Sequence, residues 1–228
     1  MRICPVTGRL SPDLAAALAA QSGDLTGPAV DERLRAALER ALASGADWLW
    51  VIDGTAVPRP GALAALAAAR DRLGDLPPPV LLTGLVVGAD GRAHPRRGPW
   101  YHRFGIDLAL LAADRGVVPV RGSRGPMLVR RDAAAAALPR PGAPFTAAAV
   151  LEWSALLLRP DRGAGYLVPE SESVGEARAG DPMRGPGTVA RLLLGRALRR
   201  LDRVALLLEL AEQAGVRRDA SEGPRRAP

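Results

Sequence analysis

The sequence predicts an α/β fold in which a mainly parallel sheet is flanked by helices. The strongest indication is Trp48–Ile52, an apolar run rich in aromatic and branched residues that lies between Gly45 and Gly54. A run of this kind is typical of a strand that is buried on both faces. Segments with helical apolar spacing come before and after it, as expected when helices cover both faces of such a sheet.

The chain is expected to open with a strand and a helix. Arg2–Val6 has the short apolar character of a strand. Ser11 is suited to cap the following helix and Pro12 to be its first residue, because that position needs no amide partner. We expect this helix to end at about Gln21.

A second helix is predicted over Val30–Ser44. Its leucines recur at every fourth position and form one apolar row of Leu34, Leu38 and Leu42. Asp31 and Glu32 then fall in the first turn, where the helix dipole favours anions, and Gly45 ends the helix.

Asp53 directly follows the buried strand, and a glycine-containing turn then leads to a helix predicted over Pro60–Leu73. In open α/β sheets, ligands bind beyond the carboxyl ends of the strands. Asp53 is therefore placed where a ligand hydroxyl or a metal ion that bridges phosphates would be held. The same carboxylate can also do no more than shape the turn, and the pattern alone leaves both interpretations open.

The remaining segments continue the alternation of strands and helices. The predicted strands are Val80–Val87, Val117–Arg121, Met127–Arg130 and Tyr166–Pro169, and residues 170–186 are expected to be loose. The predicted helices are Ile106–Asp114, Asp132–Ala137, Ala147–Leu158 and Val189–Ala214. The chain is thus expected to form one domain at 1–186, a C-terminal amphipathic helix at 187–215 and a disordered tail at 216–228.

The basic composition does not indicate a nucleic-acid partner. The chain has a net charge of +7, but every basic residue is arginine, which together with much alanine, glycine, proline and valine indicates a codon bias. Aromatic residues make up 4% of the chain, too few for a platform that stacks bases. We therefore expect no nucleic-acid partner and keep an arginine-rich binder only as a third alternative.

Cysteine and histidine positions argue against disulfide and zinc sites. Cys4 is the single cysteine, and His94 and His102 lie eight positions apart, which matches no zinc spacing. The N-terminus lacks the pattern of a signal peptide, and no apolar segment is long enough to span a membrane. The cytoplasm is the expected location.

Three blocks of sequence carry a resemblance to a known family. The first runs from Asp53 to Leu63, and the second covers Gly125–Asp132. The third consists of Leu151–Arg159 followed by Gly165–Ser171. In order, they are similar to the Asp-x-Asp strand end, the small-residue loop with an Arg-Arg-Asp helix entry, and the acidic helix with its returning strand in family 2 glycosyltransferases. The resemblance spans roughly residues 30–176.

This resemblance implies a fold and an activity. The fold is a reduced GT-A-like (nucleotide-diphospho-sugar transferase) three-layer sandwich with a mainly parallel central sheet. The activity is transfer of a sugar from a nucleotide-diphospho-sugar donor to an acceptor hydroxyl, with inversion. Such a reaction must stabilise a departing diphosphate, so the resemblance also implies Mg²⁺ or Mn²⁺ as cofactor.

The same resemblance implies roles for particular residues. Asp53 would hold the metal and the donor diphosphate, with Thr55 beside it in place of the family's second acid. Glu152 would be the general base, and Trp153 the aromatic residue on which the acceptor stacks. Apart from the resemblance, the backbone amides of the small-residue loop at Gly122–Pro126, together with Arg121 and Arg124, are suited to bind phosphate oxygens.

The residues leave other interpretations open. Glu152 can pair with a nearby arginine on the helix surface, Trp153 can belong to the core, and Arg124 can sit in a solvated hairpin. No acidic pair precedes Glu152, no histidine follows the last strand, and only 52 residues precede Asp53, with no clear strand that ends in an acid. The alternative function is therefore a catalytically inactive binding or scaffold protein.

The predicted C-terminal helix has two faces. Leucines form a seam along it and arginines lie opposite, at Arg196, Arg199, Arg200 and Arg203. This pattern suits peripheral contact with a membrane surface, and it equally suits docking against the sheet or a partner helix.

Overall fold

The structure is a computed structural model of the chain, and it describes residues 1–91, 100–101, 115–158 and 163–175. The chain divides into two units, Met1–Arg184 and Gly185–Pro228, and every described residue belongs to the first. The predicted helix at 106–114, both histidines, the C-terminal helix at 187–215 and the tail at 216–228 lie outside the described residues.

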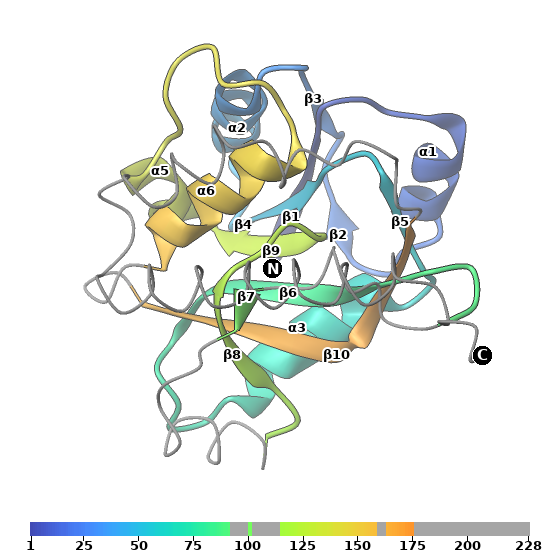
Figure 1. Ribbon diagram of the computed structural model, residues 1–228, viewed down its shortest axis with the longest axis vertical. Coiled ribbons are helices and arrows are strands. Elements are labelled where there is room, and N and C mark those ends of the chain that lie inside the picture. The colour runs from blue at the N-terminus through green and yellow to red at the C-terminus, as the bar shows by residue number, and fades with distance from the viewer. Residues whose placement is uncertain (92–99, 102–114, 159–162, 176–228) are drawn as a thin grey trace, which may run out of the picture. The chain divides into compact units, whose positions relative to one another are not determined.

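Strands and helices alternate through most of the described chain (Figure 1). The strands are β1 (Arg2–Thr7), β2 (Asp24–Leu25), β3 (Ala29–Val30), β4 (Trp48–Ile52), β5 (Ala56–Pro58), β6 (Pro79–Val87), β7 (Trp100–Tyr101), β8 (Val118–Gly122), β9 (Met127–Arg130) and β10 (Ala164–Gly175). The helices are α1 (Pro12–Ala19), α2 (Leu34–Ala43), α3 (Ala62–Arg72), α5 (Arg131–Ala136) and α6 (Ala147–Leu157).

The strands form one sheet in the order β2-β1-β4-β9-β6-β10-β8-β7, with β3 also paired to β1 and β5 to β10. Strands β1, β4, β6 and β10 run in one direction, and β9 lies antiparallel between β4 and β6. The prediction of a mainly parallel sheet is therefore confirmed for its centre. From β1 the chain goes first to β2 and β3 on one side and then to β4 on the other.

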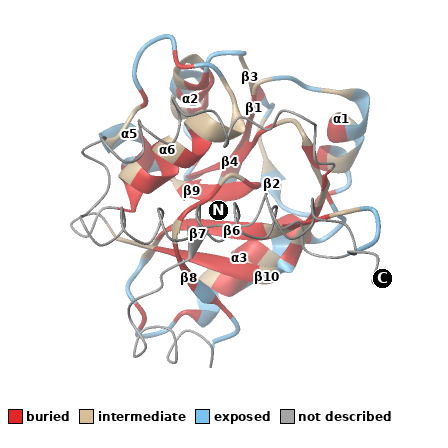
Figure 2. Cartoon of the chain, viewed as in Figure 1, coloured by how far each residue is buried: buried red, intermediate tan, exposed pale blue. Residues whose placement is uncertain are grey.

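Helices cover both faces of the sheet and make three layers. All of β4 is buried, and its alternate side chains enter two separate apolar clusters. Trp50 and Ile52 pack with residues of α1 and α3, whereas Leu49 and Val51 pack with residues of α2, α5 and α6. Figure 2 shows buried residues along the central strands and on the inner faces of the helices. The predicted α/β sandwich is confirmed.

Side-chain caps set the first residues of α1 and α6, whereas strand pairing sets the first residue of α2. The Oγ atoms of Ser11 and Thr146 accept bonds from amides in the first turns of α1 and α6. Helix α2 begins at Leu34 instead of the predicted Val30, because Val30 pairs with Thr7 as part of β3. Asp31 and Glu32 therefore lie before the helix, and their predicted place in its first turn was wrong.

The last described strand is longer than predicted. The sequence indicated a strand that ends at Pro169, but β10 continues to Gly175. A bulge between Leu167 and Glu172 interrupts its pairing with β6 and accommodates the proline. Beyond the bulge, Val174 pairs with Val57 of β5. Within the described residues, no helix has the length and apolar character that a membrane span needs.

The bulge in β10 requires a glycine on the neighbouring strand. A Cβ atom on Gly84 of β6 would lie 2.3 Å from the carbonyl oxygen of Ser171, far inside van der Waals contact. Because that oxygen belongs to the backbone, relief of the clash requires β6 and β10 to move apart.

We expect Gly84→Ala to destabilise the fold by roughly 1–3 kcal/mol, the usual cost of overpacking a core. At this size each kcal/mol lowers Tm by roughly 2–4 °C. Gly27→Ala is the matched control, because nothing lies within 4 Å of a Cβ built there. Thermal unfolding checks both variants, and equal Tm values for the two would contradict the proposed close approach.

Candidate functional site

The strand order places a candidate site at the carboxyl ends of β1, β3 and β4. Ligands of open α/β sheets bind where the strand order reverses, and here that point lies at β1. Thr7, the last residue of β1, pairs with Val30 on one side and with Ile52 on the other. Asp31 and Asp53, the residues that follow these two partners, thus leave the sheet on either side of β1.

Asp53 is held in a tight turn at this edge. Its side chain is largely buried, and its Oδ1 atom accepts bonds from the amide and the hydroxyl of Thr55, both at 2.9 Å. Gly54 takes a positive φ of 77°, and a Cβ built on it would lie 3.5 Å from both Thr7 Oγ1 and the Arg9 carbonyl. The turn therefore packs on the end of β1, and the structure brings Asp53 and Thr55 together.

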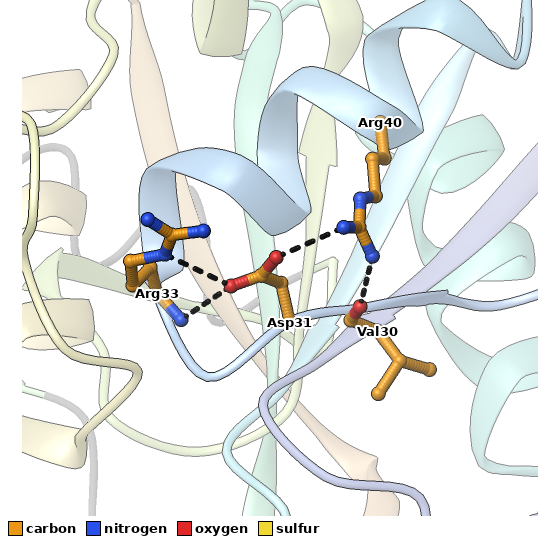
Figure 3. A network of polar contacts seen from close by, with 4 residues as sticks. All are labelled: Val30, Asp31, Arg33 and Arg40. Atoms are coloured by element: carbon orange, nitrogen blue, oxygen red, sulfur yellow. Dashed lines mark hydrogen bonds and ion pairs between the residues drawn. The ribbon is translucent and has the colours of Figure 1, made fainter.

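Asp31 lies at the centre of an arginine cluster on the other side of β1 (Figure 3). Its amide donates to the Thr7 carbonyl at 3.1 Å, which fixes it to the end of that strand. Oδ1 accepts bonds from the amide and Nε of Arg33, and Oδ2 pairs with Arg40 Nη2 at 3.1 Å. Arg40 also donates to the Val30 carbonyl at 2.7 Å, which ties α2 to β3.

The arginine cluster keeps Asp31 ionised and paired with Arg33 and Arg40 at the edge of the sheet. The amide hydrogen bond from Arg33, followed by the guanidinium groups of Arg33 and Arg40, lowers the pKa of Asp31 below its ordinary value, against an opposing effect of burial. The Arg33 side chain remains 67% exposed although it contacts Asp31. Its guanidinium can therefore meet an incoming anion at this edge.

The sequence did not indicate that Asp31 follows a strand and belongs to the site. Val30 and Asp31 continue smoothly into an apolar helical row, so the pattern favoured one long helix. The available signal was Gly27-Pro28, a pair that marks a turn and separates the preceding segment from Ala29. A strand directly followed by an acid therefore does precede Asp53, although no such strand is clear in the sequence.

The segment before α6 closes the same edge. The amide of Phe145 donates to the Glu32 carbonyl at 2.7 Å, and the amide of Leu34 donates to the Ala143 carbonyl at 2.9 Å. A Cβ on Gly8, the residue after β1, would lie 2.8 Å from Phe145 Cβ. Helix α6 therefore starts beside the ends of β1 and β3.

The two predicted residues on α6 lie in different surroundings. Glu152 is partly exposed, as are Leu156 and the first turn of α6, whereas the other residues of the helix are buried. Trp153 is 1% exposed, belongs to the apolar core, and donates from Nε1 to the Ala137 carbonyl at 2.7 Å. An acceptor-stacking role for Trp153 stays a prediction, and it requires the ring to leave this position.

The loop that contains Arg124 is a buried crossover and not an open hairpin. Residues 123–126 connect β8 to β9, and of these Arg124 is partly exposed while the others are buried. The amide of Ser123 donates to Ser154 Oγ at 2.8 Å, and the amide of Gly125 donates to Ser123 Oγ at 3.2 Å. Both amides are therefore hydrogen-bonded within the protein, which leaves the Arg124 side chain as the group of this loop that could bind a phosphate.

Asp53 is suited to hold a divalent cation only together with a phosphate ligand. In the part of the chain that the structure describes, no group of three His, Cys, Asp or Glu side chains could enclose a metal ion. Magnesium usually keeps several waters and takes one or two carboxylates with the phosphates of its ligand. One carboxylate at the sheet edge fits that second arrangement.

Comparisons with known proteins support the fold. No family model matches the chain, and no curated protein matches it. One similar solved structure is residues 1–349 of S. aureus TarS, a GT-A-like glycosyltransferase. It is 10% identical in sequence to this chain, and the two align with a TM-score of 0.51 over 90% of this chain and 67% of that one. The longer S. aureus TarS structure is 12% identical with a TM-score of 0.51, over 91% and 42%.

TarS 1–349 in complex with UDP-GlcNAc is 12% identical with a TM-score of 0.48, over 91% and 70%. The chain spans 42% of the longer TarS structure. At these identities the likeness shows the fold alone. The chain has a GT-A-like α/β fold with a central sheet that is mostly parallel in its core.

We expect acid stability to depend on Asp31. Because its pKa is lowered in the folded state, the carboxylate stabilises the fold above the ordinary value of 3.8, and this contribution is lost as the pH falls through the folded value. Asp31→Asn removes the charge and should flatten the pH dependence of the free energy of unfolding in that range. Urea unfolding from about pH 6 to about pH 2.5 measures this, and parallel curves for the two proteins would contradict it.

Proposed function

We propose that this chain is a glycosyltransferase that moves a sugar from a nucleotide-diphospho-sugar to an acceptor hydroxyl with inversion. The observation that carries the proposal is the convergence of Asp53 and the Asp31–Arg33 pair on either side of β1. This convergence occurs at the carboxyl edge of a GT-A-like sheet, where such folds bind their ligands.

The donor diphosphate would lie along this edge. Arg33 and Arg124 offer guanidinium groups that can bind phosphate oxygens in a bidentate manner. Thr55 orients the Asp53 carboxylate through two hydrogen bonds. Asp53 would hold Mg²⁺ or Mn²⁺, which when bound would neutralise the charge that develops on the departing diphosphate.

The transfer step follows from the chemistry of the two substrates. The acceptor oxygen forms a bond to the anomeric carbon while the bond from that carbon to the diphosphate oxygen breaks. The electron pair of the broken bond leaves with the nucleoside diphosphate, and attack from the opposite face inverts the configuration. Glu152 is the proposed base that takes the proton of the acceptor hydroxyl. We propose the cytoplasm as the location of this reaction.

A catalytically inactive binding protein with the same fold is the second candidate. Three observations favour it. Thr55 stands where the resembled family has an acid, Trp153 is packed in the core, and the amides of Ser123 and Gly125 are engaged within the protein. Such a protein would bind a nucleotide-diphospho-sugar and leave it intact.

Donor binding is the first test. We expect a uridine-, guanosine- or thymidine-diphospho-sugar with Mn²⁺ to stabilise the protein by about 2.7 kcal/mol at 100 times its Kd. This corresponds to a rise in Tm of roughly 5–10 °C. Asp53→Asn keeps an oxygen for Thr55 but loses the charge, so its own Tm should stay near that of the wild type and its donor-induced rise should shrink. No rise for any donor, with or without metal, would rule out the proposed binding.

Transfer itself is tested at Glu152. Glu152→Gln keeps the size of the side chain but cannot accept the proton, so sugar transfer should fall by roughly 10²-fold or more. The donor-induced rise in Tm should remain. Product formation is followed by mass spectrometry of the acceptor, and unchanged turnover would remove Glu152 as the base. Donor binding without any turnover in the wild type would favour the inactive candidate.

A further inference from the structure

A chain of buried hydroxyl groups joins the segments that carry Arg124 and Glu152. Thr83 of β6, Ser123 of the crossover and Ser154 of α6 are each 0% exposed. Polar groups in a core are costly unless they are hydrogen-bonded, and each of these has partners. Ser154 is the single hydroxyl-bearing residue of an otherwise mostly apolar helix.

Ser154 attaches α6 to both backbone groups of one residue in the crossover. Its Oγ atom accepts a bond from the Ser123 amide at 2.8 Å and lies 3.0 Å from the Ser123 carbonyl oxygen. The same Oγ lies 2.9 Å from the Leu151 carbonyl of its own helix. A Cβ on Gly122 would lie 3.3 Å from this hydroxyl, so the small residue permits the close approach.

The other two hydroxyls fix the crossover on the far side of Arg124. The Gly125 amide donates to Ser123 Oγ at 3.2 Å, and Ser123 Oγ lies 2.6 Å from Thr83 Oγ1. Thr83 donates to the Pro126 carbonyl at 3.2 Å, so the proton between the two hydroxyls belongs to Ser123. The residues on both sides of Arg124 are therefore held by one directed series of hydrogen bonds.

We infer that Thr83, Ser123 and Ser154 are positioning residues, which hold Arg124 and Glu152 at a fixed separation. Ser154 lies two residues from Glu152 on the same rigid helix, and Ser123 is next to Arg124 in the chain. Anchoring α6 to the crossover therefore sets the phosphate-binding side chain and the base in one geometry. This inference rests on the proposed function, because it assigns both residues to the same reaction.

Two substitutions at Thr83 separate positioning from stability. Thr83→Val keeps the shape and removes the hydroxyl, whereas Thr83→Ser keeps the hydroxyl and removes a buried methyl group. A positioning role predicts that Thr83→Val raises the donor Kd by about tenfold, the loss of roughly one charge-assisted hydrogen bond. It also predicts a fall in kcat, and that Thr83→Ser keeps both values near those of the wild type even where its Tm is lower.

Isothermal titration with the nucleotide-diphospho-sugars used above, together with transfer kinetics, measures these values. Ser154→Ala is the second variant and should repeat the loss if Thr83→Val does not fold. Tyr166→Phe is the control, because it removes another buried hydroxyl, which donates to the Pro77 carbonyl at 2.9 Å. It should keep the donor Kd of the wild type.

The outcomes distinguish the two proposals. If the wild type binds no donor, the proposed function fails and the positioning role fails with it. If the wild type binds a donor and Thr83→Val or Ser154→Ala binds it equally well, the positioning role alone is overturned. It is also overturned if donor affinity follows Tm, so that Thr83→Ser is as impaired as Thr83→Val.

Discussion

The candidate site depends on the burial of β4 on both faces beside β1. Every side chain of β4 is enclosed between two layers of helices, so the chain can present a polar group only where the strand ends. That group is Asp53. Because β1 lies between β3 and β4, the same edge also receives Asp31. Without the reversal of strand order at β1, the two carboxylates would have no reason to lie near each other.

The two carboxylates at this edge are treated differently by their surroundings. The backbone amide of Arg33, followed by the guanidinium groups of Arg33 and Arg40, lowers the pKa of Asp31, and the Arg33 side chain stays exposed to solvent. Asp53 is oriented by the amide and hydroxyl of Thr55, which bring no charge of their own. A diphosphate needs cationic partners, and a cation that accompanies it needs an anionic one. The proposed donor site would use the arginine side of the edge for phosphate oxygens and the Asp53 side for the accompanying cation.

Close approaches at three glycines make this arrangement possible. Gly8 admits Phe145, Gly84 admits the bulge of β10, and Gly122 admits α6. A Cβ atom at Gly8 or Gly84 would clash with its neighbour, and one at Gly122 would be tightly packed. Each glycine lies against an element that is distant in sequence. The hydrogen bonds of Ser123 and Ser154 then fix the crossover beneath α6. Packing of small residues therefore determines where the longer polar side chains emerge.

The sequence by itself determined the layers of the fold, the strand that ends at Asp53 and the start of α1 at its serine cap, because local apolar spacing and capping chemistry encode them. Only the tertiary structure decided the short strands β3 and β5 and the extension of β10, since their stability comes from partners far along the chain. Tertiary packing also decided that Trp153 enters the core and that Asp31 directly follows a strand. Burial and register arise from long-range contacts, which no local pattern contains.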